Sequence, residues 1–229
     1  MNGATHPILP MASGEDRARS LGQVVVHLRE GGLVVYPTET VYGVGGLLLP
    51  AALEALAVVK DRSDDSPFLL LIPSTDVVEG LIWSPAAMAL ADHFWPGPMT
   101  LILPDPVGTF PGGVRSLDGG VAVRISPNPI VRDLLTELDM PLTSTSANRR
   151  GRPPVRSPRE VDLPLPPFGL EERLQGASGL IPILDGGDLP PSPPSTLVDC
   201  TGEYPVVLRE GGVSTHELRQ VIPETSRHV

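Results

Sequence analysis

Proline and glycine together make up more than a fifth of this chain of 229 residues, with 28 prolines and 24 glycines. Proline fixes φ and has no amide hydrogen to donate, and glycine weakens the interior of helices and strands. Both residues therefore tend to end regular elements. The sequence predicts a protein of many short elements that are joined by many turns.

Hydrophobic periodicity and capping residues divide the chain into elements. Apolar residues at helical spacing predict a helix that opens at Ser13 and stops at Gly31 and Gly32. We expect further helices over 51–59, 85–94 after Ser84, 129–138 after Asn128, near 170–174, and from the capping box of Ser214 and Glu217. Apolar runs predict strands at 33–36, 68–72, 99–103, 121–125, 142–145, 181–184, 196–198 and 206–208. Because strands outnumber helices and alternate irregularly with them, we expect an α/β fold with a mixed sheet.

The length fits one α/β domain, although two domains of ordinary size remain open. We expect a single domain over residues 13–222, with flexible tails over 1–12 and 223–229. No basic stretch is followed by an apolar segment near residue 1, and nowhere do roughly 18 apolar residues run unbroken. The sequence indicates neither secretion nor a membrane span.

Charge and cysteine content narrow the function classes. The formal net charge is −10, from 17 Lys+Arg and 27 Asp+Glu. Because phosphate neutralisation supplies most of the sequence-independent affinity for nucleic acid, this balance argues against such binding, while a local basic cleft stays open. Cys200 is the only cysteine, which excludes an internal disulfide and a CxxC metal site and fits a reducing compartment. We therefore expect a cytoplasmic protein.

The basic residues are almost all arginine, and Lys60 is the only lysine among them. A bias that has converted every other cation to arginine would be expected to convert this one too, unless an ammonium is needed there. Chance survival of one lysine is the alternative, since the two residues often replace each other on a surface. Lys60 is thus a candidate functional cation.

Arg124 lies inside the apolar run from Val121 to Ile125. A buried and unpaired guanidinium would cost several kcal/mol, so Arg124 must find an anion or a cleft. A structural carboxylate is one partner, and a carboxylate or phosphate of a ligand is the other. The sequence leaves both open.

Motifs of several enzyme classes are missing from the sequence. It contains no GxxxxGK[ST] phosphate loop, GxGxxG, HExxH or GxSxG, and its five histidines are scattered without metal-ligand spacing. We therefore predict no metal site in the protein itself.

Hydroxyl, amide and arginine side chains gather between residues 144 and 159. Three hydroxyls and one amide lie within 144–148, and five arginines follow in a proline-rich loop over 149–159. Such donors beside fixed positive charge suit a phosphate–ribose ligand, although similar clusters are more often turn chemistry. The turn from Trp95 to Pro98 is interpreted as rigid packing rather than as a binding site.

Seven segments in this order resemble the YrdC-like family of threonylcarbamoyl-adenylate synthases, in their single-domain form. The matching segments are 31–45 (GGLVVYPTETVYGVG), 60–67 (KDR…SP), 95–101 (WPGPMTL), 121–125 (VAVRI), 146–148 (SAN), 195–199 (STLVD) and 208–211 (LREG). The resemblance implies a twisted mixed sheet, parallel and antiparallel, that is flanked by helices and carries a concave ligand cleft.

The resemblance also implies the chemistry. L-Threonine, bicarbonate or CO2, and ATP would give threonylcarbamoyl-AMP and pyrophosphate, with Mg2+ carried in on the nucleotide. Transferase proteins downstream would then modify tRNA, which this chain itself would bind weakly or not at all. Lys60 and Arg62 are implied as the catalytic phosphate cations. Residues implied to face the nucleotide are Lys60, Arg62, Ser66, Ser146, Asn148 and Arg209, and those implied to face threonine are Thr38, Arg124, Ser144 and Ser195.

The chain departs from the usual family pattern at five positions near these residues. Asp61 stands where the family has glycine, Leu71 where many members have histidine, Arg150 and Pro154 where they have serine, and Glu210 where they have proline. Two alternative functions stay open. One is an RNA-binding or ribosome-associated module of the same fold without catalysis, and the other is an enzyme that forms an adenylate from carbamoyl phosphate.

Overall fold

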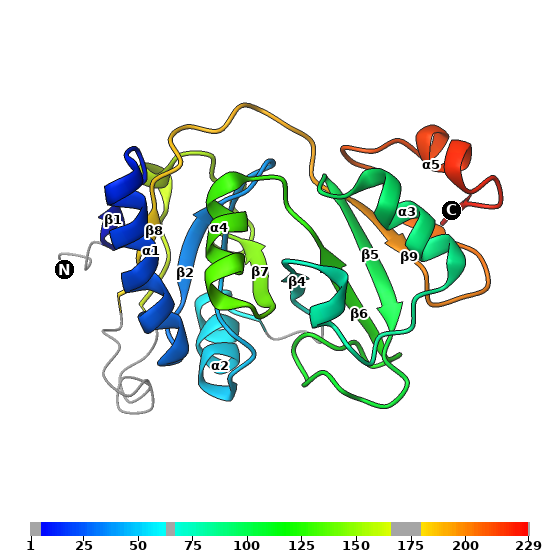
Figure 1. Ribbon diagram of the computed structural model, residues 1–229, viewed down its shortest axis with the longest axis horizontal. Coiled ribbons are helices and arrows are strands. Elements are labelled where there is room, and N and C mark those ends of the chain that lie inside the picture. The colour runs from blue at the N-terminus through cyan, green and yellow to red at the C-terminus, as the bar shows by residue number, and fades with distance from the viewer. Residues whose placement is uncertain (1–5, 63–66, 166–179, 229) are drawn as a thin grey trace.

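The computed structural model describes residues 6–62, 67–165 and 180–228. In these ranges the strands form one eleven-stranded sheet in the order β1-β8-β2-β3-β7-β4-β6-β5-β9-β10-β11 (Figure 1). The strands are β1 (Ile8–Leu9), β2 (Val34–Pro37), β3 (Tyr42–Gly45), β4 (Leu69–Leu71), β5 (Met99–Pro104), β6 (Gly120–Arg124), β7 (Leu142–Ser146), β8 (Ile183–Leu184), β9 (Thr196–Asp199), β10 (Val206–Arg209) and β11 (Ser226–Arg227). Parallel pairs such as β4 with β6 occur beside antiparallel pairs such as β3 with β7. The predicted mixed sheet is confirmed.

Helices cover the sheet at both ends of the molecule (Figure 1). The described α-helices are α1 (Gly14–Arg29), α2 (Pro50–Val59), α3 (Pro85–Phe94), α4 (Pro129–Leu138) and α5 (Thr215–Val221). α1 packs beside α4, and their apolar faces enclose one buried cluster with residues such as Val34 and Leu71. The other cluster lies between the sheet and α2, α3 and α5.

The predicted caps set where three helices begin. Ser84 Oγ accepts from Ala87 N at 3.1 Å at the start of α3, and Asn128 Oδ1 accepts from Ile130 N at 3.0 Å at the start of α4. Each helix then has proline at its first position, where no amide donor is required. The predicted capping box of Ser214 and Glu217 opens α5.

Close approach of β3 and β7 explains one glycine of the matching segments. A Cβ on Gly45 would lie 1.5 Å from the carbonyl oxygen of Thr143, so only glycine fits there. The hydroxyl of Thr143 also accepts from Gly46 N at 2.9 Å and donates to Gly46 O at 2.8 Å. This contact fixes the register that brings Ser144 and Ser146 beside Gly43.

Short segments near both ends of the described chain pair with the sheet, within the ranges expected as tails. Residues Ile8–Leu9 pair in parallel with Ile183–Leu184, and Met11 is buried. His6 joins two distant segments, since its Nδ1 accepts from Ile181 N at 3.1 Å and its Nε2 lies 3.0 Å from Leu163 O. At the other end, Ser226–Arg227 pair with β10. These two-residue strands have no periodicity, so their sequences gave no sign of them.

Two further expectations concern the helix near residues 170–174 and the absence of a membrane span. The short helix expected near 170–174 lies outside the described residues. In the ranges that the structure describes, no helix is long and apolar enough to cross a membrane.

Candidate functional site

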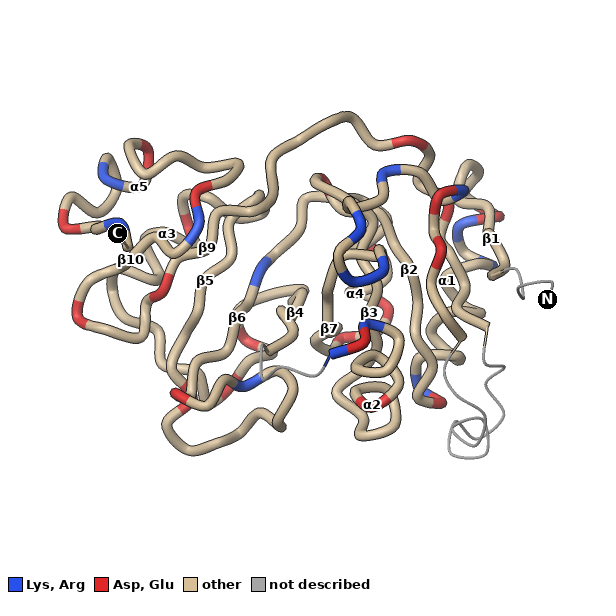
Figure 2. Tube along the Cα trace, turned by 180° about the vertical axis from the view of Figure 1, so that it is seen from behind, with Lys and Arg blue, Asp and Glu red and all other residues tan. Residues whose placement is uncertain are grey.

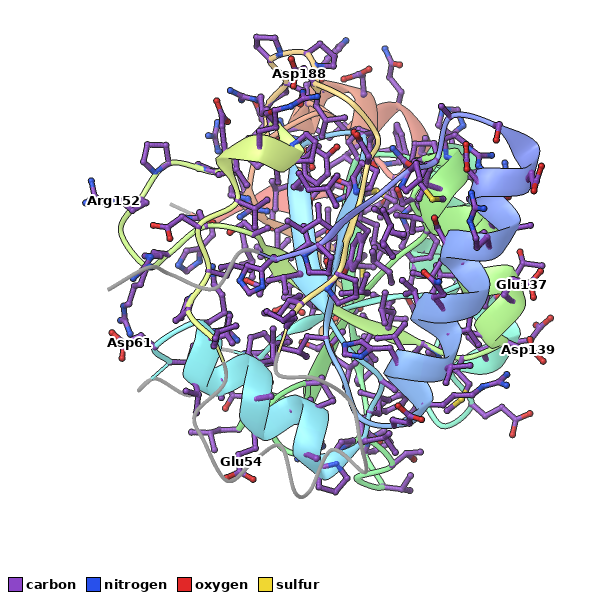
Figure 3. The ribbon with its side chains drawn as sticks, turned by 90° about the vertical axis from the view of Figure 1, so that its left-hand side faces the viewer. Glu54, Asp61, Glu137, Asp139, Arg152 and Asp188 are labelled. Atoms are coloured by element: carbon purple, nitrogen blue, oxygen red, sulfur yellow. The ribbon has the colours of Figure 1, made fainter. Side chains whose placement is uncertain are left out.

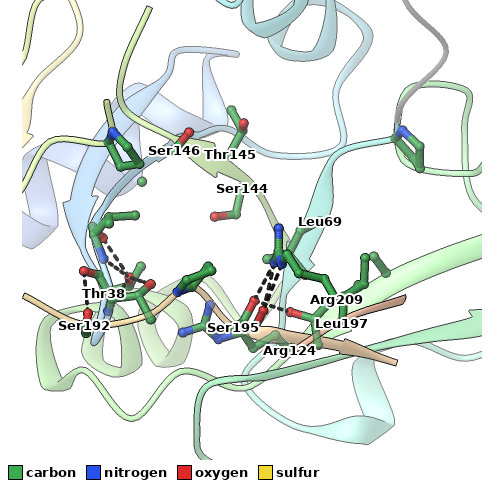
Figure 4. A pocket seen from close by; sticks show the side chains of 18 of the residues that line it. Thr38, Leu69, Arg124, Ser144, Thr145, Ser146, Ser192, Ser195, Leu197 and Arg209 are labelled. Atoms are coloured by element: carbon green, nitrogen blue, oxygen red, sulfur yellow. Dashed lines mark hydrogen bonds between the residues drawn. The ribbon is translucent and has the colours of Figure 1, made fainter. Parts of the chain in front are cut away.

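A pocket of about 680 Å³ opens where β3 and β7 face β5, β6 and β9 (Figure 4). Seven of the predicted site residues line it: Thr38, Arg62, Arg124, Ser144, Ser146, Ser195 and Arg209. Ser144 and Ser146 are two positions apart on β7 and both contribute to its wall. The sheet therefore collects residues that are up to 171 positions apart in the sequence into one cavity.

Two predicted residues lie elsewhere, and a third is not described. Asn148 lines a neighbouring cavity of about 480 Å³ with Arg149 and Arg152. Ser66 lies outside the described residues. Lys60 does not line the pocket but lies behind its wall, at the C-terminal end of α2.

Lys60 connects α2 to the end of β7. Its side chain is buried, and Nζ donates to the carbonyl oxygen of Ser146 at 2.7 Å and to that of Asn148. Burial, and to a smaller extent the nearby positive charge of Arg62, lowers the pKa of Lys60 from 10.5 to about 8. The ammonium thus holds the chain from Ser146 to Asn148 in place, a role that the sequence did not indicate.

The turn after Lys60 explains one departure from the family pattern. Asp61 has φ of +46°, in the left-handed region that favours glycine and that aspartate tolerates better than most residues. The guanidinium of Arg150, another departure, donates to the Asp61 carbonyl at 3.0 Å. Next in the chain, the Arg62 guanidinium lies 4.1 Å above the ring centroid of Phe68. The two unusual residues, Asp61 and Arg150, are therefore hydrogen-bond partners.

Arg124 ends β6 and is almost completely buried. Its Nη2 forms an ion pair with Glu39, and its Nε donates to the carbonyl oxygen of Gly97 at 3.2 Å. Ser126 Oγ donates to the other Glu39 oxygen at 2.7 Å. Burial lowers the pKa of Arg124 to about 10. The structural carboxylate is thus present, and Arg124 also reaches the pocket wall.

The turn from Trp95 to Pro98 contributes to the site indirectly. It contains a cis peptide bond between Trp95 and Pro96, and the Trp95 indole donates to Met99 O at 2.6 Å. Because the Gly97 carbonyl accepts from Arg124, this rigid turn orients the guanidinium. Thr100, the second residue after the turn, lines the pocket and was missed by the sequence interpretation.

Thr100 belongs to a polar group with Ser195 and Arg209. The hydroxyls of Thr100 and Ser195 are 3.0 Å apart, and Arg209 donates to the carbonyl oxygen of Ser195 from Nη2 at 2.9 Å and from Nε at 3.2 Å. Burial lowers the pKa of Arg209. Figure 4 shows Ser195 and Arg209 together on one side of the pocket, opposite Ser144 and Ser146.

Thr38 lines the pocket and stabilises a local turn with its hydroxyl. Its hydroxyl donates to Val41 O at 2.7 Å and accepts from the amides of Thr40 and Val41 at 3.1 and 3.2 Å. Thr40 in turn holds Ser192, whose hydroxyl donates to the Thr40 carbonyl at 3.0 Å. Thr40 and Ser192 also line the pocket and were not predicted.

The remaining departures have different locations. Leu71 is fully buried in the cluster under α1 and α4 and is not among the pocket residues. Pro154 lines the pocket. Glu210 accepts from the backbone and hydroxyl of Thr215 at the start of α5, and these hydrogen bonds lower its pKa. Glu210 therefore has a structural role that accounts for its presence.

The charges in the pocket define what it can bind. Its described lining contains four arginines, several hydroxyls and no aspartate or glutamate. Within the described part of the chain, no group of three or more His, Cys, Asp or Glu could hold a metal ion. An open cleft of this kind, in a mixed α/β sheet, defines a protein that binds an anionic small molecule.

The chain belongs to the Sua5/YciO/YrdC family, whose sequence model, described as telomere recombination, matches residues 26–211. A Mycobacterium tuberculosis (strain H37Rv) relative is 33% identical over 214 residues, which cover 92% of this chain and 93% of the relative. The threonylcarbamoyl-AMP synthase of Pyrococcus abyssi is 36% identical over 207 residues, covering 88% of this chain and 56% of that protein.

A solved structure has the same fold. The crystal structure of P. abyssi Sua5 complexed with L-threonine superimposes with a TM-score of 0.81 at 31% identity. The match covers 98% of this chain and 63% of that chain, so this chain spans less than two thirds of the archaeal protein.

Proposed function

We propose that this chain is a threonylcarbamoyl-AMP synthase, a nucleotidyltransferase that joins L-threonine, bicarbonate or CO2, and ATP for tRNA modification. The observation that carries the proposal is the convergence of seven predicted residues on one pocket without lining carboxylates. The similarity to a threonylcarbamoyl-AMP synthase and to a threonine-bound Sua5 supports it. No observation favours a non-catalytic RNA-binding module or a carbamoyl-phosphate enzyme.

The reaction requires two bond-forming steps. The threonine amine attacks CO2 and loses a proton, which gives a carbamate. A carbamate oxygen then attacks the α-phosphorus of ATP, the bond to the β-phosphate oxygen breaks, and pyrophosphate leaves. Since both partners are anionic, the protein must position them and neutralise charge rather than supply a nucleophile.

Residues of this chain can provide these functions. Arg124 and the hydroxyls of Thr38, Ser144 and Ser195 would hold threonine, with Arg124 on its carboxylate. Arg62, Ser146, Asn148 and Arg209 would face the nucleotide, as would Ser66. Lys60 would supply positive charge behind the phosphate-facing wall, through the chain that it fixes at Ser146.

Magnesium, location and partners complete the proposal. The described lining offers no carboxylate to a metal ion, so Mg2+ would be held by the phosphates with which it enters. There it would neutralise charge on the leaving pyrophosphate. The enzyme would work in the cytoplasm, and separate transferase proteins would carry its product to tRNA.

The direct test is release of pyrophosphate from ATP by the full chain. We expect release that requires both L-threonine and bicarbonate, with threonylcarbamoyl-AMP detected by mass spectrometry. Serine and L-valine serve as matched amino-acid controls, because they remove the methyl and the hydroxyl group separately. ATP turnover that is the same without threonine would refute the proposal.

A further inference from the structure

Arg156 is the arginine of the 149–159 loop that enters the pocket. Other arginines of the loop are engaged elsewhere: Arg149 forms an ion pair with Asp162 at 2.8 Å, and Arg150 donates to Asp61 O. Arg152 projects from the outer side of the loop (Figure 3). The loop therefore delivers one guanidinium to the ligand cavity.

The backbone around Arg156 is fixed by the segment that precedes β9. Leu189 N donates to the Arg156 carbonyl at 2.8 Å, and Arg156 Nη2 donates to the carbonyl oxygen of Ser192 at 3.3 Å. Ser192 is itself held by Thr40. The side chain is thus attached to the pocket wall at one nitrogen.

Unlike Nη2, the Nε atom of Arg156 is buried without a hydrogen-bond partner in the structure. Buried donors are rarely left unpaired, and each such group requires an explanation. Among the described residues, no carboxylate forms an ion pair with the Arg156 guanidinium. Its charge is therefore not balanced by a carboxylate among the described residues, although its side chain lines the pocket.

The charges of the pocket indicate which kind of anion Arg156 would bind. Arg124 already has Glu39 beside it and is suited to one carboxylate, such as that of an amino acid. The lining contains three further arginines, namely Arg62, Arg156 and Arg209. A triphosphate carries several negative charges, whereas threonine contributes one carboxylate and no further anion.

We propose that Arg156 binds the phosphate chain of the nucleotide, as an additional cation supplied by the arginine-rich loop. The inference rests on the proposed function, since it takes ATP as the ligand. Arg156 would present its guanidinium to a phosphate oxygen, and a turn of the side chain on binding would give Nε the partner that it lacks.

The test compares Arg156→Gln with Arg159→Gln by titration calorimetry with ATP, inorganic pyrophosphate and L-threonine, each alone. Arg159 is in the same loop, is exposed and does not line the pocket, so its variant removes the same charge from the same segment. We expect Arg156→Gln to weaken ATP and pyrophosphate binding about tenfold or more, and Arg159→Gln to change it less than twofold. Threonine affinity should stay the same in both.

Arg156→Lys is a second, conservative variant that separates a loss of binding from a loss of fold. It keeps the charge but loses the planar donors, so it should recover part of the ATP affinity. Melting temperatures equal to that of the parent would show that the fold is intact. ATP affinity in Arg156→Gln equal to that in Arg159→Gln, or a loss confined to threonine, would overturn the inference.

These measurements are separable from the proposed function, because ATP binding is read without turnover. A parent protein that binds ATP through Arg156 but releases no threonine-dependent pyrophosphate would refute the synthase proposal alone. A parent that forms threonylcarbamoyl-AMP while Arg156→Gln binds ATP normally would refute only the role of Arg156.

Discussion

The ammonium of Lys60 donates to two backbone carbonyls, and its pKa is lowered by burial and by the nearby charge of Arg62. Its pKa of about 8 lies below the ordinary 10.5, so the unfolded chain binds more protons than the folded protein between these values. In that range the contribution of this group to the free energy of unfolding rises with pH. The positive charge near the phosphates falls over the same range.

We therefore predict that ATP affinity decreases as pH rises through about 8, while the fold does not weaken through Lys60. Lys60→Met should bind ATP weakly at every pH and lose this dependence. It should also be less stable by about 1 to 3 kcal/mol, because the carbonyls of Ser146 and Asn148 lose their donor. Calorimetry with ATP between pH 6.5 and 9.5 measures the first effect. A parallel pH profile in the variant would contradict it.

Arg124 and Glu39 form an ion pair in which each neutralises the charge of the other. Arg124→Met should reduce threonine affinity about ten- to a hundredfold, as expected for loss of a charged hydrogen bond. It should also destabilise the fold, because Glu39 loses its partner. Adding Glu39→Gln should restore stability but not threonine binding. ATP binding measured alone is the control, and its loss would move Arg124 to the nucleotide.

At the scale of elements, the 149–159 loop is attached at both sides of the site, to Asp61 through Arg150 and to Ser192 through Arg156. We predict that ATP with threonine slows proteolysis after the arginines of this loop, because bound phosphate adds a third attachment. Trypsin cleavage between exposed Arg150 and Gly151 reports the effect. Cleavage at Arg29, at the end of α1, is the control. Equal protection of both would indicate global stabilisation instead.

Local signals in the sequence were sufficient for most elements but not for their contacts. Ser84, Asn128 and the Ser214–Glu217 box predicted the helix starts because a cap acts within four residues. The pairing of Arg150 with Asp61 spans 89 positions and follows no periodicity. Thr100 was missed because the turn before it resembled packing alone. Arg124 and the hydroxyls of 144–146 could be suspected from the sequence itself, whereas the place of Thr38, Ser195 and Arg209 in the pocket was expected only through the family resemblance.

At the scale of the whole molecule, acidic and basic residues are both distributed over the elements (Figure 2). In the described pocket lining, by contrast, arginines are the only charged residues. With a net charge of −10, the protein should attract a small anion locally while repelling a long polyanion. We predict that unmodified tRNA binds at least a hundredfold more weakly than ATP at about 0.15 M salt. Fluorescence anisotropy with labelled tRNA measures this. Tight, salt-sensitive tRNA binding would contradict it.

The pairing of β1 with β8 covers an edge of the sheet that could otherwise pair with a second copy of the chain. Without Ile8–Leu9, the outer side of β8 would present unpaired amide and carbonyl groups to other molecules. Deletion of residues 1–12 should therefore yield a chain that forms soluble aggregates by light scattering, whereas deletion of 1–5 should leave it dispersed. A dispersed, fully active chain beginning at Ser13 would show that this edge needs no cover.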